Sequence, residues 1–153
     1  MSNHPVTVTI NGVEYEREVE ARKLLIHFVR DDLDLTGSHI GCDTGNCGAC
    51  SMIVDGTLVK SCMMLAVQAD GATVETVEGL ADGDQLSPLQ QSFSEHHALQ
   101  CGYCTPGMLM SATALLRENP SPSEDEIRKA LQGNICRCTG YWNIFEAVKA
   151  VAK

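Results

Sequence analysis

Residues 41–50 read GCDTGNCGAC, and this short stretch decides how the rest of the chain has to be arranged. Cys42, Cys47 and Cys50 are separated by four and then two residues, a spacing that suits the ligands of a [2Fe-2S] cluster. Such a cluster needs a fourth thiolate further along the chain. Cys62 is the natural candidate, because eleven residues separate it from Cys50.

Three glycines lie among these cysteines. A loop folded over inorganic sulfide needs inward-pointing N–H groups and some residues at positive φ, which Gly41, Gly45 and Gly48 tolerate best. A structural zinc site or a disulfide framework is the alternative interpretation. Zinc sites favour matched pairs of cysteines two to four residues apart, so the glycine-rich loop fits a caged cluster better.

Composition narrows the class of protein. The 153 residues are enough for one medium domain or two small ones, and small domains commonly need a metal to hold them. A net charge of -9 argues against a nucleic-acid surface, and no apolar run is long enough for a transmembrane segment. We expect a cytoplasmic protein, in which the eight cysteines bind metal rather than form disulfides.

The first half, residues 1–77, has the pattern of a small mixed sheet crossed by one helix. Asn11-Gly12, Asp55-Gly56 and Asp70-Gly71 are turn signals between β-branched runs. The helix is expected over 23–33, and the strands over 6–10, 14–19, 49–54, 58–61 and 73–77. One helix on about five strands predicts the β-grasp architecture of plant-type ferredoxins, with Cys62 returning on a strand.

Residues 78–87 are polar and aperiodic and are interpreted as a linker to a helical second half, residues 88–153. Helices are expected over 88–99, 105–119, 124–132 and 141–152, which predicts a four-helix bundle. Ser123 and Glu126 form a capping box for the third of these helices. Met108 and Met110 are expected to fill the core. The fold class is therefore α+β.

Four more cysteines lie in this helical half, as Cys101 with Cys104 and Cys136 with Cys138. Each pair directly precedes a predicted helix, so the four thiolates should meet where two helix N-termini converge. The positive ends of two helix dipoles would favour an anionic cluster. Two neighbouring four-thiolate sites indicate an electron relay, since a single structural metal needs no neighbour.

Together with GCDTGNCGAC, the segments LQCGYCTPGM (99–108) and GNICRCTGY (133–141) resemble the small iron–sulfur subunits of the molybdenum hydroxylases. The resemblance covers nearly the whole chain. It implies a plant-ferredoxin-like domain followed by a four-helix [2Fe-2S] domain. It also implies a large molybdopterin-binding subunit and a medium FAD-binding subunit as separate chains, in a dimer of heterotrimers.

The resemblance assigns roles to single residues. Cys101, Cys104, Cys136 and Cys138 would hold the cluster near molybdenum, and Cys42, Cys47, Cys50 and Cys62 the one near flavin. Gln100 and Cys138 match positions that approach the pterin, where electrons would enter. No catalytic residue is expected on this chain.

Residues 23–44 and 118–128 look most like the carbon monoxide dehydrogenase branch of the family. The chain departs from that branch at Gly45-Asn46 and at Trp142, so this resemblance does not fix the substrate. Related small subunits belong to enzymes that act on aldehydes, purines, caffeine, nicotine and other N-heterocycles. Two functions of other classes stay open: a free-standing ferredoxin, which leaves the helical half without a task, and a zinc-stabilised interaction module.

Overall fold

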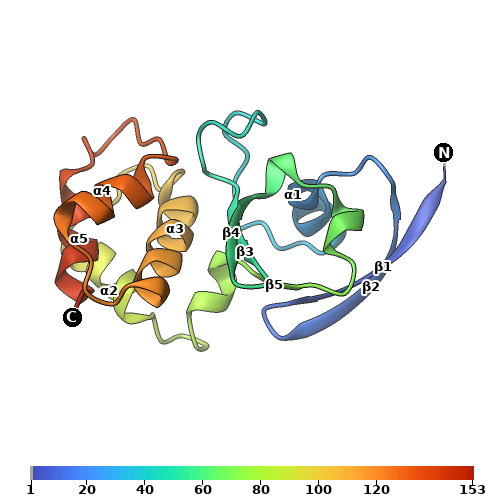
Figure 1. Ribbon diagram of the computed structural model, residues 1–153, viewed down its shortest axis with the longest axis horizontal. Helices are drawn as coiled ribbons and strands as arrows, with labels where there is room; N and C mark the ends of the chain where they lie inside the picture. Colours follow the sequence, from blue (N-terminus) through green and yellow to red (C-terminus); the bar gives the residue numbers. More distant parts are fainter. Residues whose placement is uncertain (1) are drawn as a thin grey trace.

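The computed structural model describes residues 2–153, as two packed halves side by side along the long axis of the molecule (Figure 1). The first half holds a five-stranded sheet with the strand order β2-β1-β5-β3-β4. Its strands are β1 Asn3–Ile10, β2 Val13–Glu20, β3 Ser51–Val54, β4 Thr57–Lys60 and β5 Thr73–Glu75. The α+β class and the ferredoxin-like sheet are confirmed.

The chain opens with the expected hairpin of β1 and β2. Asn11 and Gly12 form its turn with φ values of 51° and 82°, the left-handed pair that a two-residue hairpin requires. Strand β1 pairs in parallel with β5, which joins the hairpin to the antiparallel β3–β4 pair. The sheet is thus mixed.

The crossing helix is shorter and less regular than the predicted 23–33. It consists of α1, Leu25–His27, followed by a π-helical turn, Phe28–Asp32. Its apolar side chains, Leu25, Ile26, Phe28 and Val29, are all fully buried. Packing against the sheet therefore holds a segment that is too short to be a stable helix alone.

Strand β5 ends at Glu75, earlier than the predicted residue 77, and Val77–Leu80 form a 3₁₀ turn. Cys62 is the clearest correction in this half. It lies in a 3₁₀ turn, Ser61–Met63, directly after β4, and not on the strand itself.

Four helices make up the second half of the described chain, as expected: α2 Pro88–Glu95, α3 Thr105–Glu118, α4 Glu124–Leu131 and α5 Trp142–Val151. Ser87 and Ser123 cap α2 and α4 through capping boxes. Helix α2 stops four residues early, and His97 just beyond it has a φ of 51°. Met108 and Met110 are fully buried, as predicted.

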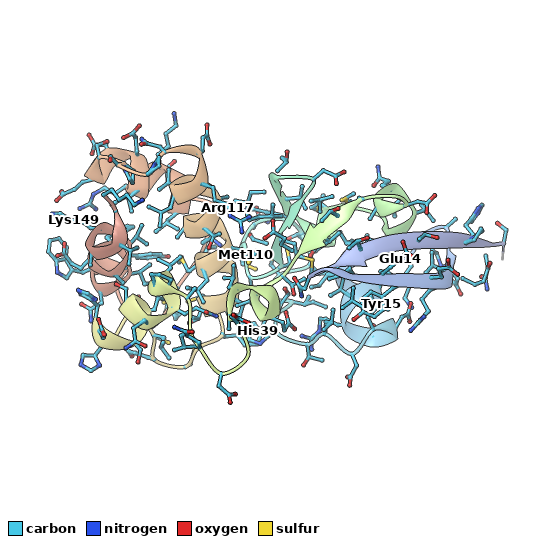
Figure 2. The ribbon with its side chains drawn as sticks, turned by 90° about the horizontal axis from the view of Figure 1, so that it is seen from below. Glu14, Tyr15, His39, Met110, Arg117 and Lys149 are labelled. Atoms are coloured by element: carbon cyan, nitrogen blue, oxygen red, sulfur yellow. The ribbon has the colours of Figure 1, made fainter. Side chains whose placement is uncertain are left out.

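The two halves meet along α3. A side chain on Gly107 of α3 would place its Cβ 2.1 Å from the Gly48 carbonyl oxygen, so the backbones touch directly. Arg117, further along α3, forms two hydrogen bonds of 2.7 and 2.8 Å with Glu75 of β5. Figure 2 shows Arg117 and Met110 on this helix beside the sheet half. In the described residues, no helix is long and apolar enough to cross a membrane.

Candidate metal centres

The first set of cysteines lies on the loop between the π-helical turn and β3, with Cys62 just after β4. In Figure 1 this loop, coloured cyan to teal, stands between the sheet and α3. Cys50 and Cys62 are buried, and Cys42 and Cys47 are half-buried. The sulfur atoms of Cys50 and Cys62 are hydrogen-bond neighbours, as are those of Cys42 and Cys47. The fold therefore brings the four expected ligands together.

Backbone N–H groups point at the sulfur of Cys42, from Thr44 at 3.4 Å and from Cys47 at 3.3 Å. Gly45 and Gly48 have the expected positive φ of 75°. Gly41 does not have a positive φ. A glycine there leaves room for the Cys47 sulfur, because a Cβ on Gly41 would lie 2.8 Å from it. The loop is shaped around sulfur, as the glycine pattern predicted.

Opposite pKa changes mark this site. A hydrogen bond from the Thr44 side chain, with N–H donors of Cys47 and Thr44, lowers the pKa of Cys42 to about 6. Burial, with the Cys50 thiol beside it, raises the pKa of Cys62 to about 11. Cys62 therefore stays protonated at neutral pH unless a bound cation offsets the cost of its charge.

The second set lines one cavity of about 310 Å³ between the helical half and the first cysteine loop. Cys136 is buried, Cys104 half-buried, and Cys101 and Cys138 exposed. The thiols of Cys104 and Cys136 are hydrogen-bond neighbours, although two helices separate them in the chain. Cys101 and Cys138 thus form the exposed side of this cavity.

The pKa values in this set also diverge. Burial, reinforced by the Cys136 thiol, raises the pKa of Cys104 to about 12. Burial also acts on Cys136, but hydrogen bonds from the Thr139 hydroxyl, the N–H groups of Thr139 and Cys138, and Cys104 outweigh it and lower its pKa. As in the first set, hydrogen bonds lower the pKa of one thiol, and burial raises the pKa of the thiol beside it.

The helix dipoles act on this set only in part as expected. Cys104 is the N-cap of α3, so one helix does begin at a cysteine. The last helix was expected from residue 141, but Gly140 and Tyr141 have φ values of 65° and 69° and lie before it. Helix α5 begins at Trp142, and Tyr141, not a cysteine, is its N-cap.

Both sets fit a [2Fe-2S] cluster by the chemistry of their donors. All eight cysteines are free thiols, in two groups of four, and four thiolates are the usual ligands of such a cluster. The buried Thr105 hydroxyl next to Cys104 has no hydrogen-bond partner, and a sulfide-containing group would offer it an acceptor. Within residues 2–153, no three histidine, cysteine or carboxylate side chains are arranged to hold a single metal ion.

The two sets adjoin each other. The N–H of Ile135, next to Cys136, donates a 2.8 Å hydrogen bond to the carbonyl of Cys47. The buried Asn134 side chain donates to the Gly48 carbonyl at 3.1 Å and accepts a 2.7 Å bond from Ser111. Cys47 also lines the cavity of the second set. One hydrogen bond therefore joins the peptide of one expected ligand to the neighbour of another.

Sequence reasoning missed a second connection, between His39 and Tyr103. Their rings stack with centroids 4.5 Å apart, and His39 Nδ1 lies 2.8 Å from the Tyr103 carbonyl oxygen. The Tyr103 hydroxyl donates to the Ile40 carbonyl at 2.6 Å. Pattern rules carry no signal for a contact between residues so far apart in the chain.

Gln100, expected near the pterin, is exposed beside Cys101 at the open side of the second site. A larger hollow of about 820 Å³ lies elsewhere, between β2 and the first helix. Several of its charged side chains pair with one another, Lys23 with Asp32 at 2.5 Å for example, and no cysteine lines it.

Known proteins resemble this chain over its full length. Residues 8–87 match the model of the 2Fe-2S iron-sulfur cluster binding domain, and residues 76–149 match that of the [2Fe-2S] binding domain. The caffeine dehydrogenase subunit gamma of Pseudomonas sp. (strain CBB1) is 50% identical over 99% of this chain and 93% of its own length. The nicotine 6-hydroxylase small subunit of Paenarthrobacter nicotinovorans is 54% identical over 94% of this chain and 86% of its own length.

Solved structures show the same similarity. A chain of quinoline 2-oxidoreductase from Pseudomonas putida 86 superposes with a TM-score of 0.96 at 49% identity, covering 99% of this chain and 94% of that one. The fold and the two cysteine sets thus define an iron–sulfur electron carrier. The chain belongs to the family of small [2Fe-2S] subunits of the molybdenum hydroxylases.

Proposed function

We propose that this chain carries electrons, one at a time, between a molybdopterin site on one partner and a flavin on another. The observation that carries the proposal is the contact between the two cysteine sets. Cys47 lines the cavity of the second set, and its carbonyl accepts the Ile135 N–H at 2.8 Å. Two redox sites held this close form a relay, whereas two structural metals would have no need to adjoin.

The same geometry supports the proposed ligand sets. Cys42, Cys47, Cys50 and Cys62 hold one [2Fe-2S] cluster, and Cys101, Cys104, Cys136 and Cys138 hold the other. A bound [2Fe-2S] cluster accepts and releases single electrons. The chain itself supplies thiolates, directs N–H donors such as those of Thr44 and Thr139 at sulfur, and buries Cys50 and Cys136 away from water.

Exposure supports the order of the carriers. Cys101, Cys138 and Gln100 are exposed at the open side of the second cavity, where a pterin could approach. Exposed apolar side chains, Leu99, Tyr103, Ile135 and Trp142, belong to the same two cysteine-bearing segments. In this proposal the molybdopterin subunit covers this side, and electrons leave toward flavin from the first site.

The partners are a large molybdopterin-binding subunit and a medium FAD-binding subunit, assembled as a dimer of heterotrimers. The names of the relatives, a subunit gamma and a small subunit, support a multi-subunit enzyme. The eight free cysteines support a reducing compartment such as the cytoplasm.

For the substrate, we propose an N-heterocyclic compound. Caffeine, nicotine and quinoline, which occur in the names of the similar proteins, are all N-heterocycles. The carbon monoxide dehydrogenase type expected from residues 23–44 and 118–128 stays a prediction, and it is the first competitor to test. Substrate assays of the purified complex with carbon monoxide and with these heterocycles separate the two.

Metal analysis and purification test the electron-transfer role. Two [2Fe-2S] sites require about four iron and about four sulfide per chain, and full anaerobic reduction should give two distinct paramagnetic species. Two zinc without visible absorbance would select the interaction module. A native chain that runs alone at its own mass would instead select a free-standing ferredoxin.

A further inference from the structure

A closed set of hydrogen bonds surrounds Cys136 at the second site. The Cys136 N–H donates to the Tyr141 hydroxyl oxygen at 3.0 Å, and the Tyr141 N–H donates to the Thr139 Oγ1 at 3.1 Å. Thr139 in turn contacts the Cys136 sulfur twice, through its N–H at 3.4 Å and its Oγ1 at 3.1 Å. We call these three residues the Cys136 ring.

The direction of the Thr139 hydroxyl proton follows from the ring. Its oxygen already accepts the Tyr141 N–H, so its own hydrogen is free for another acceptor. The Cys136 sulfur is the acceptor that the structure provides, at 3.1 Å. A metal-bound sulfur carries no proton, so the hydroxyl has to be the donor. Cys136 thus receives two hydrogen bonds from one threonine.

Backbone strain supports a specific role for this ring. Tyr141 has a φ of 69°, a left-handed conformation that is strained for a residue other than glycine. The conformation turns its N–H toward Thr139. Packing holds it there, since the Tyr141 ring stacks on Phe145 at 6.3 Å and Arg128 covers Phe145 at 4.8 Å. Residues under such strain cluster at functional sites.

We propose that Thr139 is a positioning residue that sets the reduction potential of the second site through its hydroxyl. This inference rests on the proposed function. Reduction adds one electron and no proton, so negative charge on the ligand sulfurs grows. A fixed O–H donor stabilises the more negative state better than the less negative one, which raises the potential. The Tyr141 N–H keeps the donor aimed at sulfur.

The first site offers a matched control. There the Thr44 hydroxyl bonds the Cys42 sulfur, and its oxygen accepts a 2.9 Å bond from the side chain of Asn46. The Thr44 hydroxyl is held less firmly than the Thr139 hydroxyl. Thr44 and Asn46 are exposed, and the donor that orients the Thr44 hydroxyl is a flexible side chain. Thr44→Val should therefore move the potential of the first site only, and by less.

The test is a redox titration with dithionite of the purified complex, in which the two paramagnetic species are followed separately. In Thr139→Val the hydroxyl is lost and the shape kept, and the reduction equilibrium of the second site should shift by up to about tenfold, or about 59 mV more negative. Thr139→Ser should keep the wild-type midpoint, and Thr44→Val should leave the second site unchanged.

An unchanged midpoint in Thr139→Val with full iron content would overturn the inference, as would an equal shift of both species. If Thr139→Val loses iron, Thr139→Ala removes the same hydroxyl without added bulk, and its midpoint decides. Loss of iron in both variants means that Thr139 is structural and overturns the inference too. Failure of the proposed function looks different, because wild-type protein would then lack two iron-containing species.

Discussion

The two cysteine sets achieve similar chemistry by opposite structural means. The first is local: Cys42, Cys47 and Cys50 share one loop, and Cys62 returns at the end of the next hairpin. The second is assembled from distant segments, since α3 and α4 lie between Cys104 and Cys136. The first site thus depends on loop conformation, and the second on the packing of the whole bundle.

Their surroundings differ in the same sense. Two ligands of the first set are buried and none is fully exposed, whereas Cys101 and Cys138 of the second set are exposed. A site made by a loop can be enclosed by that loop. A site between helix ends stays open on one side, which leaves it accessible to a partner. Four predictions can break or sharpen this comparison, and they follow in order of expected effect.

The largest effect is expected from removing one ligand of either set. Cys104→Ser should reduce the iron from about four to about two per chain and stop reduction of flavin by substrate. Cys47→Ser should lose the same amount of iron but leave the second site reducible. Iron analysis and spectroscopy of the reduced complex measure both. Normal electron transfer to flavin in both variants would show that the proposed order of carriers is wrong, and circular dichroism serves as the folding control.

Gly107→Ala should weaken the packing between the two halves. Its Cβ would lie 2.1 Å from the rigid Gly48 carbonyl, and such overpacking costs about 2–3 kcal/mol of the free energy of unfolding. The control is Gly133→Ala in the same region, whose Cβ meets only the flexible end of Lys60 at 3.2 Å. Denaturant unfolding measures both variants. Equal stability of the two would mean that the contact between Gly107 and Gly48 adapts easily.

Ser123→Ala should loosen the second half alone. The Ser123 hydroxyl accepts the Glu126 N–H at the start of α4, and losing such a cap costs about 1 kcal/mol. Hydrogen exchange should quicken in α4 and not in the β1–β2 hairpin. Ser121→Ala, two residues earlier, is the control, because Ser121 is exposed and its side chain makes no hydrogen bond within the described chain. Faster exchange throughout would mean that the halves unfold as one unit.

The smallest effect should come from the ion pair that joins the halves. Hydrogen bonds from Arg117 lower the pKa of Glu75 below its ordinary value of about 4.3. A lowered pKa stabilises the folded state above that ordinary value, and the contribution disappears as pH falls through the folded value. Because both side chains are partly exposed, Glu75→Gln should cost only about 0.5 kcal/mol at pH 7.

The stabilities of Glu75→Gln and wild type should converge as the pH falls through the folded-state pKa of Glu75, because Glu75 is then protonated in both states. Glu124→Gln is the control, since the pair of Glu124 with Lys149 lies on the surface within the helical half, far from the sheet (Figure 2). A difference between Glu75→Gln and wild type that stays constant as the pH is lowered would rule out charge as its cause.

Local patterns were enough to predict much of this molecule. The Asn11-Gly12 turn, the capping box at Ser123 and the helical half were all confirmed, because each depends on residues close in the chain. Helix α5, expected from about residue 141, begins one residue later, and nothing in Thr139-Gly140 reveals that Tyr141 adopts a left-handed conformation as its N-cap. The π-helical turn after α1 was also missed, because tertiary packing and not helical periodicity sets it.

Cysteine spacing predicted two groups of four ligands, and the fold places the members of each group near one another. It could not predict the contact between the groups. The hydrogen bond from Ile135 to Cys47 and the stack of His39 on Tyr103 join residues more than sixty positions apart. Such contacts depend on how the two halves dock, and no local pattern records docking.

The bare backbone contact between Gly48 and Gly107 has a consequence for how such proteins can be recombined. Each half presents a residue without a side chain to the other, and a side chain at Gly48 would also strike the Gly133 carbonyl, at 2.3 Å. A chimera that grafts one half onto a foreign counterpart must therefore supply a glycine at each of these positions. The halves look modular in sequence, yet they can be exchanged only as a matched pair.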